Sequence, residues 1–112
     1  MHKTVKGWRI IGKKRYYFRS SWEMSFALFL QIKKQGGLIK DWEYEPQTFW
    51  FEKIRRGVRS YKPDFKLYHN DNSTSWVEVK GYMDAKSKTK LKRFKKYYPE
   101  EKIEVVSSDW FK

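Results

Sequence analysis

The chain contains no cysteine among its 112 residues and only two histidines, His2 and His69. The absence of cysteine excludes disulfide bonds, thiolate zinc sites and cysteine nucleophiles, and it favours a reducing compartment. Two histidines are too few for a nuclease whose metal is held by several imidazoles. No apolar run approaches the length of a membrane span, and the N-terminus lacks the apolar core of a signal peptide. We therefore expect a soluble, intracellular protein with no membrane partner.

Acidic residues are scarce as well: 13 Asp and Glu stand against 26 Lys and Arg, which gives a formal net charge of +13. Such a charge favours a polyanionic partner, and nucleic acid comes before a membrane because no segment has the apolar face of a membrane-surface helix. The same charge could instead serve solubility alone. Aromatic residues make up 20% of the chain, so we expect a single folded domain, residues 1–112, with an aromatic core.

The residue pattern predicts a mixed α/β fold with a central sheet, two flanking helices and the element order αβββαβ. Two helices are expected, one from Ser20 or Ser21 to about Gln35 and one over 84–98 with Asp84 as N-cap. The first is apolar around nearly its whole circumference, which predicts a largely buried helix. The N-terminal residues are expected to form a basic, irregular arm. The arm covers 1–18, and strand-like stretches cover 38–45, 48–56, 61–69, 74–81 and 102–106.

Two short motifs carry the chemistry: Pro63-Asp64, and Glu78 followed by Lys80. The turn formers at 69–73 should join the two motifs into a hairpin, and a turn centred near residue 71 would place Asp64 across from Glu78. Because side chains alternate along a strand, Glu78 and Lys80 should point to one side of the sheet. We therefore expect two carboxylates and one ammonium group to meet at one place.

That combination suits a divalent cation and a phosphate. Mg²⁺ or Mn²⁺ takes one or two protein carboxylates, here Asp64 and Glu78, and the backbone carbonyl of Val79 could be a third ligand. A bound cation would polarise a phosphodiester and activate water, and Lys80 would orient that water or neutralise charge on the phosphate. The alternative is an exposed cross-strand salt bridge, which contributes less than about 1 kcal/mol. The motifs together favour the catalytic interpretation, a nuclease.

Glu23 is a third candidate acid. With Ser20 it fits a capping box, in which a Glu at the third helical position bonds back to the start of the helix. On a helical wheel, however, it falls between residues that should face the sheet, Phe26, Ala27 and Leu30. A carboxylate there needs a partner, because an isolated buried charge is costly. A shared metal would supply one, and both roles can coexist.

The expected second helix has no acid between Asp84 and Glu100. Like charges four residues apart disfavour a helix by roughly 0.2–0.5 kcal/mol per pair, so this face favours contact with phosphates. Solubility is the alternative for any single residue. The expected nucleic-acid-binding residues are Lys13, Lys14, Arg15, Arg19, Arg55, Arg56, Arg59, Lys86, Lys88, Lys90, Lys92, Arg93, Lys95 and Lys96. Aromatic residues that could stack on unpaired bases, or else belong to the core, are Tyr16, Tyr17, Phe18, Trp50 and Phe51.

The order helix, Pro-Asp strand, hairpin, Glu-x-Lys strand, basic helix and final strand resembles the PD-(D/E)xK nuclease superfamily. Within that superfamily the chain is similar to Holliday-junction resolvases of the phage endonuclease I type. The resemblance covers residues 19 to about 109. The matching pieces are 19–23, 42–45, 62–65, 77–81, 98–100 and 103–107.

This resemblance implies a restriction-endonuclease-like core in which Asp64 and Glu78 hold Mg²⁺ or Mn²⁺, Lys80 is the catalytic lysine and Glu23 is the additional acid. It also implies a homodimer that cuts a four-way DNA junction, in the cytoplasm or, if phage-encoded, the host cytoplasm. In such dimers the first helix and strand swap between subunits, here across Pro46, and Glu23 would then complete the partner's site. Two alternatives stay open: a nicking or DNA-end-processing endonuclease that acts on duplex DNA, and a non-catalytic DNA-binding module.

Overall fold

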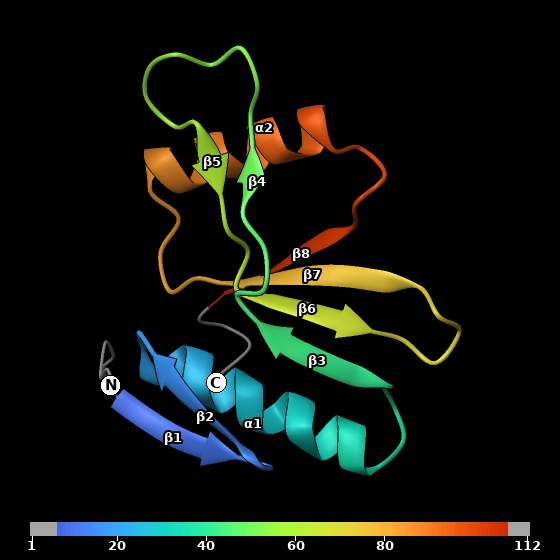
Figure 1. Cartoon of the computed structure of the whole chain (residues 1–112). Coiled ribbons are helices and arrows are strands. Elements are labelled where there is room, and N and C mark those ends of the chain that lie inside the picture. Colours follow the sequence, from blue (N-terminus) through green and yellow to red (C-terminus); the bar gives the residue numbers. More distant parts are fainter. Residues whose placement is uncertain (1–6, 108–112) are drawn as a thin grey trace.

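The computed structural model describes residues 7–107, which form two helices, one main sheet and two small two-stranded sheets (Figure 1). The predicted mixed α/β class is thus confirmed. The elements are β1 (Gly7–Ile11), β2 (Lys14–Phe18), α1 (Ser21–Gln35), β3 (Asp41–Tyr44), β4 (Phe49–Trp50), β5 (Ser60–Tyr61), β6 (Phe65–Tyr68), β7 (Thr74–Val79), α2 (Ala85–Tyr97) and β8 (Ile103–Val106).

The main sheet is four-stranded, with the order β3-β6-β7-β8. β6 pairs antiparallel with both β3 and β7, whereas β8 pairs parallel to β7. Helix α2 makes the crossover between these two parallel strands, as the sequence predicts. Figure 1 shows α1 on one side of the sheet, and α2 with β4 and β5 on the other.

Helix α1 begins at the predicted place, because the Ser20 side chain accepts a hydrogen bond from the Glu23 amide. Its inner face packs into the larger core cluster, which includes Phe26, Leu30 and strand residues such as Phe65. The helix is not buried all round, however. Ile32 is 67% exposed, so the expectation of a largely buried helix is wrong, because the sheet and the N-terminal strands cover only part of its circumference.

The expected irregular arm over 1–18 is also wrong where the structure describes it. Residues 7–18 form a β-hairpin in which Ile11 pairs with Lys14 and Gly7 with Phe18. Gly12 takes a φ of +64° in the turn, a conformation that glycine adopts without steric cost. Ile11 and Phe18 belong to the core cluster that contains α1, so burial of these side chains orders the hairpin. Residues 1–6 lie outside the described part.

Two predicted long strands are much shorter in the structure. The stretch 48–56 keeps strand pairing only at Phe49–Trp50, and Lys53 within it takes a φ of +72°. The stretch 61–69 is split, because Pro63 has no amide hydrogen to donate to a sheet. Its first part, β5, pairs with β4, and its second part, β6, joins the main sheet.

The strands β4 and β5 close a second core cluster against α2. It contains Phe49, Phe51 and Tyr61 together with Trp76 of β7 and Phe94 of α2. Strand β7 is therefore covered on both faces, since its other face carries Val77 and Val79 into the first cluster. Within residues 7–107, neither α1 nor α2 combines the length and the apolar character that a membrane-spanning helix needs.

Candidate active site

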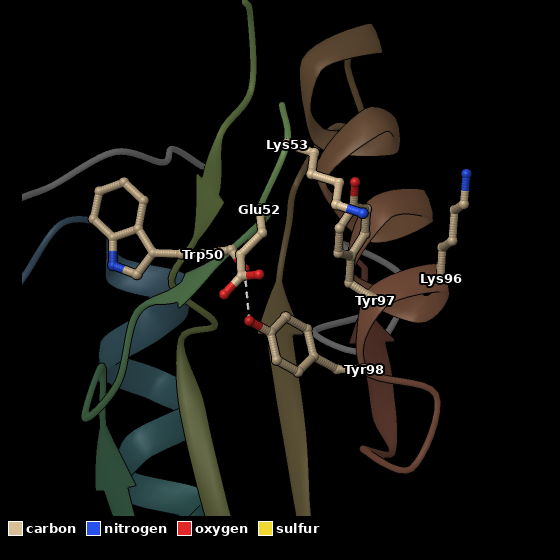
Figure 2. Close-up of a pocket in the computed structure, with 6 residues that line it drawn as sticks. All are labelled: Trp50, Glu52, Lys53, Lys96, Tyr97 and Tyr98. Carbon is tan, nitrogen blue, oxygen red and sulfur yellow. Dashed lines mark hydrogen bonds between the residues drawn. The ribbon is translucent and has the colours of Figure 1, made fainter. Parts of the chain in front are cut away.

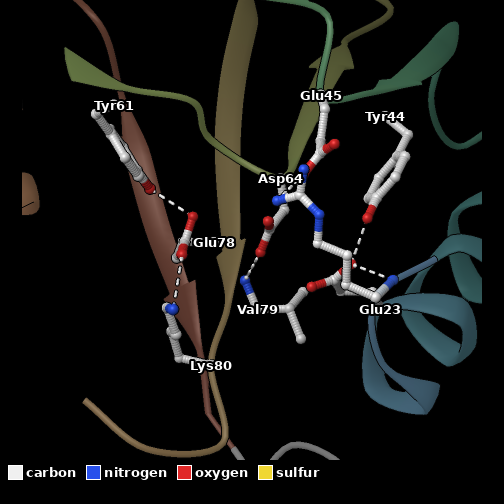
Figure 3. Close-up of polar contacts among 9 residues, drawn as sticks. Glu23, Tyr44, Glu45, Tyr61, Asp64, Glu78, Val79 and Lys80 are labelled. Atoms are coloured by element: carbon white, nitrogen blue, oxygen red, sulfur yellow. Dashed lines mark hydrogen bonds and ion pairs between the residues drawn. The ribbon is translucent and has the colours of Figure 1, made fainter. Parts of the chain in front are cut away.

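The candidate site lies at one edge of the main sheet, where β3 and β7 end and β6 begins. The start of α1 lies close to this edge (Figure 3). The ladder between β6 and β7 pairs Phe65 with Val77, so the next position brings Asp64 level with Glu78, as predicted. The Glu45 amide donates to the Asp64 carbonyl over 2.7 Å, which fixes the backbone of Asp64 from the side of β3. The Asp64 Oδ2 atom accepts a 2.8 Å hydrogen bond from the Val79 amide, so the carboxylate points across to β7.

Glu78 lies on the opposite face of β7 from Val77 and Val79, yet it is buried. The covering group is Tyr61, which donates its hydroxyl hydrogen to Glu78 Oε1 over 2.6 Å. The Lys80 Nζ atom lies 3.8 Å from Glu78 Oε2 at the open side of the site. The predicted same-side placement of Glu78 and Lys80 is confirmed. The salt bridge exists, but because its acid is buried it differs from the exposed cross-strand pair of the alternative interpretation.

Glu23 approaches the site from the first turn of α1. Its Oε1 atom accepts hydrogen bonds from the Tyr44 hydroxyl and, over 3.3 Å, from the Arg19 amide. The second bond is a capping-box contact displaced by one residue from the expected donor, the Ser20 amide. One half of the predicted capping box is confirmed, because the Ser20 side chain accepts from the Glu23 amide. In the other half, the Arg19 amide replaces the expected Ser20 amide as donor to Glu23. Within this single chain, the charge of Glu23 contributes to raising the pKa of both Asp64 and Glu78. The three acids therefore lie near one another without an exchange of segments between subunits.

Glu45 is a fourth acid at the site, with no role in the sequence-based prediction. It follows the end of β3 with a φ of +48°, and its Oε2 atom is buried without a hydrogen bond in the described part of the chain. The Arg19 Nη1 atom lies 3.0 Å from that oxygen, so charge attraction alone partners it there. Burial raises the pKa of Glu45, whereas Arg19 and Lys62 act in the opposite direction.

The electrostatics of the site are dominated by burial of negative charge. Burial, and then the nearby charges of Glu78 and Glu23, raise the pKa of Asp64 to about 9 from an ordinary 3.8. Burial also raises the pKa of Glu78, against the opposing effects of the Tyr61 hydrogen bond and of Lys80 and Lys90. The pKa of Tyr61 is raised as well, by burial and by the neighbouring charge of Glu78. Without a bound cation, the site thus favours a proton on at least one carboxyl group.

A divalent cation fits this donor set in part. Across residues 7–107, no group of three or more acidic or histidine side chains is arranged to hold a metal ion by itself. Mg²⁺, however, commonly takes one or two protein carboxylates and completes its shell with water and substrate phosphate. Asp64 and Glu78 are the two carboxylates that could do so, and burial together with neighbouring acids raises the pKa of each, which a bound cation would offset. Glu23, with Oε1 already engaged, fits better as a neighbouring acid than as an obligatory ligand.

Gly81 allows the segment that follows β7, which carries Lys80, to lie close to α1. A Cβ atom at this position would lie 1.6 Å from the ring of Trp22. The Lys80 amide donates to the Val106 carbonyl over 2.9 Å, which extends the parallel pairing past Val79 and holds this segment. The glycine is thus explained by close packing on the first turn of α1.

The structure brings only some of the predicted nucleic-acid-binding residues near the acids. Arg19 lies within the site, and Lys90 is close enough to lower the pKa of Glu78. Lys86 and Arg59 line a hollow together with Lys90. The remaining residues lie elsewhere. Lys13 and Lys14 are at the turn of the N-terminal hairpin, Arg15 lies over the Trp8 ring, and Arg55 and Arg56 are in the loop between β4 and β5. On α2, Arg93 donates to the Val58 carbonyl, and the exposed lysines among these remaining residues are Lys88, Lys92, Lys95 and Lys96.

The aromatic residues that were candidates for stacking on bases divide into buried and exposed side chains. Phe18 and Phe51 are buried, and Tyr16 stacks on Trp42 with ring centroids 5.2 Å apart, so these three belong to the core. Tyr17 and Trp50 are exposed.

Sequence reasoning missed Tyr61, Tyr44 and Glu45 as parts of the site. A signal existed for Tyr44, which is two positions beyond the buried Trp42 on a short strand and so shares its inward face. For Tyr61 there was no comparable signal, because its strand was expected to be continuous with the one that precedes the hairpin turn.

Comparison with known proteins places the chain in a family whose description gives no function. Residues 7–111 match the model of the family described as "Protein of unknown function (DUF1064)". No curated protein matches the chain.

Proposed function

We propose that this chain, which belongs to the DUF1064 family, is a metal-dependent endonuclease that hydrolyses DNA phosphodiester bonds. The observation that carries the proposal is the convergence of Asp64, Glu78 and Lys80 at the ends of two adjacent strands. Buried acids with raised pKa values, beside a lysine and on a strongly basic protein, are typical of sites that handle an anionic substrate through a cation. With the two small sheets left out, the two helices and the main sheet follow the order αβββαβ. This order supports a restriction-endonuclease-like core, which we propose as the fold.

Asp64 and Glu78 would hold Mg²⁺ or Mn²⁺, and the Val79 carbonyl would be a third oxygen ligand. When bound, the cation would supply Lewis acidity toward the scissile phosphate and toward a water molecule. Tyr61 fixes one oxygen of Glu78, so the other oxygen stays directed toward Lys80. The Val79 amide fixes Asp64 in the same way.

Lys80 would act on the substrate itself. Its side chain is 34% exposed, and its ammonium group lies beside Glu78. It is thus at the edge of the acid cluster, the name used here for Glu23, Glu45, Asp64 and Glu78. From there it can donate hydrogen bonds to a water molecule or to a non-bridging phosphate oxygen. In the hydrolysis, a bond forms between the water oxygen and phosphorus, and the bond from phosphorus to the leaving oxygen breaks. The water gives up one proton as it attacks and the leaving oxygen takes one up, so no proton is gained or lost overall. Lys80 would offset charge that develops on the phosphate.

The substrate that we propose first is a branched DNA such as a four-way junction, cut by a homodimer. The basis is the resemblance in the order of motifs. A nicking or end-processing activity on duplex DNA is the alternative within the same chemistry. The non-catalytic alternative is less favoured, because a protein that only binds DNA gains nothing from buried carboxylates beside its phosphate contacts.

The proposal is tested by incubating the protein with a labelled four-way junction and with a linear duplex of the same sequence. We expect Mg²⁺ or Mn²⁺ to support cleavage of the junction, and EDTA to abolish it. Faster cleavage of the duplex would favour the alternative activity. No cleavage of either DNA with any of these cations would reject the endonuclease. Light scattering on the same sample checks the dimer, because a monomer at micromolar concentration argues against paired cuts.

A further inference from the structure

We propose that a hollow beside the acid cluster binds an unpaired nucleotide of the DNA, with Trp50 stacked on its base. The inference rests on the proposed function and deepens it, since it specifies which DNA feature the enzyme recognises. The hollow, called here the Trp50 hollow, has a volume of about 340 Å³, within the range of small-molecule sites. Its lining residues are Trp50, Gly57, Val58, Arg59, Ser60, Lys86 and Lys90.

The charge of the Trp50 hollow suits a phosphate. Three of its lining residues, Arg59, Lys86 and Lys90, are cationic, and none of the described lining residues is acidic. On the surface of α2, Lys86 and Lys90 are four residues apart and therefore lie on the same side of the helix. Repulsion between them is relieved when an anion binds, so this cluster is complementary to the DNA backbone.

The position of the Trp50 hollow connects it to the acids. Lys90 lies near enough to Glu78 to lower the pKa of that carboxyl group. Ser60, another lining residue, directly precedes Tyr61, which holds Glu78 by its hydroxyl group. The hollow is therefore bordered by residues that adjoin the surroundings of Glu78.

Trp50 provides an aromatic surface at this place. Its neighbour Phe49 is buried against α2, and strand alternation turns Trp50 to the opposite face, where it is 61% exposed. The backbone is held there, because the Tyr98 hydroxyl donates to the Trp50 carbonyl over 2.6 Å. Trp50 also borders a second hollow, lined by Glu52, Lys53, Lys96, Tyr97 and Tyr98. Figure 2 shows the indole ring directed away from Lys96, Tyr97 and Tyr98. The backbone that carries the ring is thus held in place, and the exposed indole ring can meet a ligand.

The ring favours an unpaired base over a paired one. Inside a duplex, both faces of each base are covered by neighbouring bases, whereas an unpaired base has a face available for stacking. The loop that borders the hollow is already held in place, because Arg93 donates to the Val58 carbonyl and the Phe51 amide donates to the Arg59 carbonyl over 2.9 Å. Such a site requires little ordering on binding.

The test measures binding of a 12-nucleotide oligothymidylate by fluorescence anisotropy in EDTA, so no catalysis is involved. Trp50→Ala should weaken binding by about tenfold, and Trp50→Phe should retain most of the affinity. Trp8→Ala is the matched control, since Trp8 is also exposed (54%) but lies on the N-terminal hairpin. Its variant should bind within about twofold of wild type. Circular dichroism confirms that each variant is folded.

The cations are tested by the salt dependence of the same binding. Each of Arg59→Ala, Lys86→Ala and Lys90→Ala should reduce the slope of log affinity against log salt by about 0.7. The control is Lys40→Ala, because Lys40 is bonded to Asn72 near the hairpin turn that joins β6 and β7.

Unchanged binding by Trp50→Ala, or an equal loss in Trp8→Ala, would overturn the nucleotide site. Unchanged salt slopes in all three cation variants would overturn it as well. Neither result bears on metal-dependent cleavage of DNA by the wild-type protein. Conversely, a Trp50-dependent affinity in a protein that never cleaves DNA would leave this site standing and remove the endonuclease.

Discussion

The Tyr61 hydroxyl donates a 2.6 Å hydrogen bond to Oε1 of Glu78, across a stretch of chain that includes a proline and a hairpin turn. Both groups are buried, and the bond is one of the effects that lower the pKa of Glu78 against the cost of burial. The pair links the β4–β5 layer to the main sheet at the candidate site. Tyr61 is therefore a positioning residue for Glu78.

Tyr61→Phe should reduce the free energy of unfolding by about 1–3 kcal/mol, because the buried Glu78 loses a hydrogen bond. Since that bond lowers the pKa of Glu78, the variant should also need a higher pH to reach half of its maximal cleavage rate. Tyr68→Phe is the matched control, because Tyr68 also bonds a glutamate, Glu43, but at a half-buried position outside the candidate site. Equal losses of stability in the two variants, measured by urea unfolding, would contradict the positioning role.

The raised pKa of Asp64 has a consequence for stability in the absence of metal. Between pH 4 and about 9 the folded state retains a proton that the unfolded chain releases, because the pKa of Asp64 is about 9 in the fold against an ordinary 3.8. The folded state thus binds more protons, and its stability should fall as the pH rises through this window. Asp64→Asn should flatten the decline of the melting temperature in EDTA. Asp71→Asn is the control, since Asp71 is exposed and its pKa is lowered.

Divalent cations should reverse this loss of stability. Ligand carboxylates must be deprotonated to bind a metal, so Mg²⁺, Mn²⁺ or Ca²⁺ should raise the melting temperature more at pH 8 than at pH 6. The effect should disappear in Asp64→Asn and in Glu78→Gln. An increase of the same size in either variant would place cation binding outside the acid cluster.

Gly81→Ala should destabilise the protein by about 1–3 kcal/mol, because the added methyl group overlaps the Trp22 ring and forces either β7 or α1 to move. Gly36→Ala is the matched control, since its new Cβ would meet the Ile32 carbonyl at an ordinary 3.4 Å. Chemical unfolding of both variants checks the difference. Similar stability of the two variants would show that the approach of Gly81 to Trp22 is loose.

Local patterns were sufficient to predict the helices, the hairpin and the placement of Asp64 opposite Glu78. Alternation and turn length are short-range properties, and they decide the register of an antiparallel pair. The buried Glu78 was not predictable in that way. Its cover comes from Tyr61, whose strand leaves the main sheet at Pro63, and the sequence pattern does not reveal which sheet a two-residue strand joins.

The N-terminal hairpin illustrates the same limit. Basic residues at 13–15 and 19 suggested an irregular arm, because charge dominates the composition there. Burial of Ile11 and Phe18 against α1 decides otherwise, and this tertiary contact outweighs the local preference. Glu45 likewise joins the site only because β3 ends beside Asp64, a neighbour far away in the sequence.

The endonuclease proposal is tested most directly by single-turnover cleavage of a labelled junction in Mn²⁺, with DNA binding measured in parallel. Wild-type protein should cleave, whereas Asp64→Asn and Glu78→Gln should cleave at least about a thousandfold more slowly. Both variants should bind the junction as tightly as wild type or more tightly, because they leave the phosphate-contacting cations unchanged and add no negative charge. Cleavage by either variant at the wild-type rate would contradict the assignment of these two carboxylates.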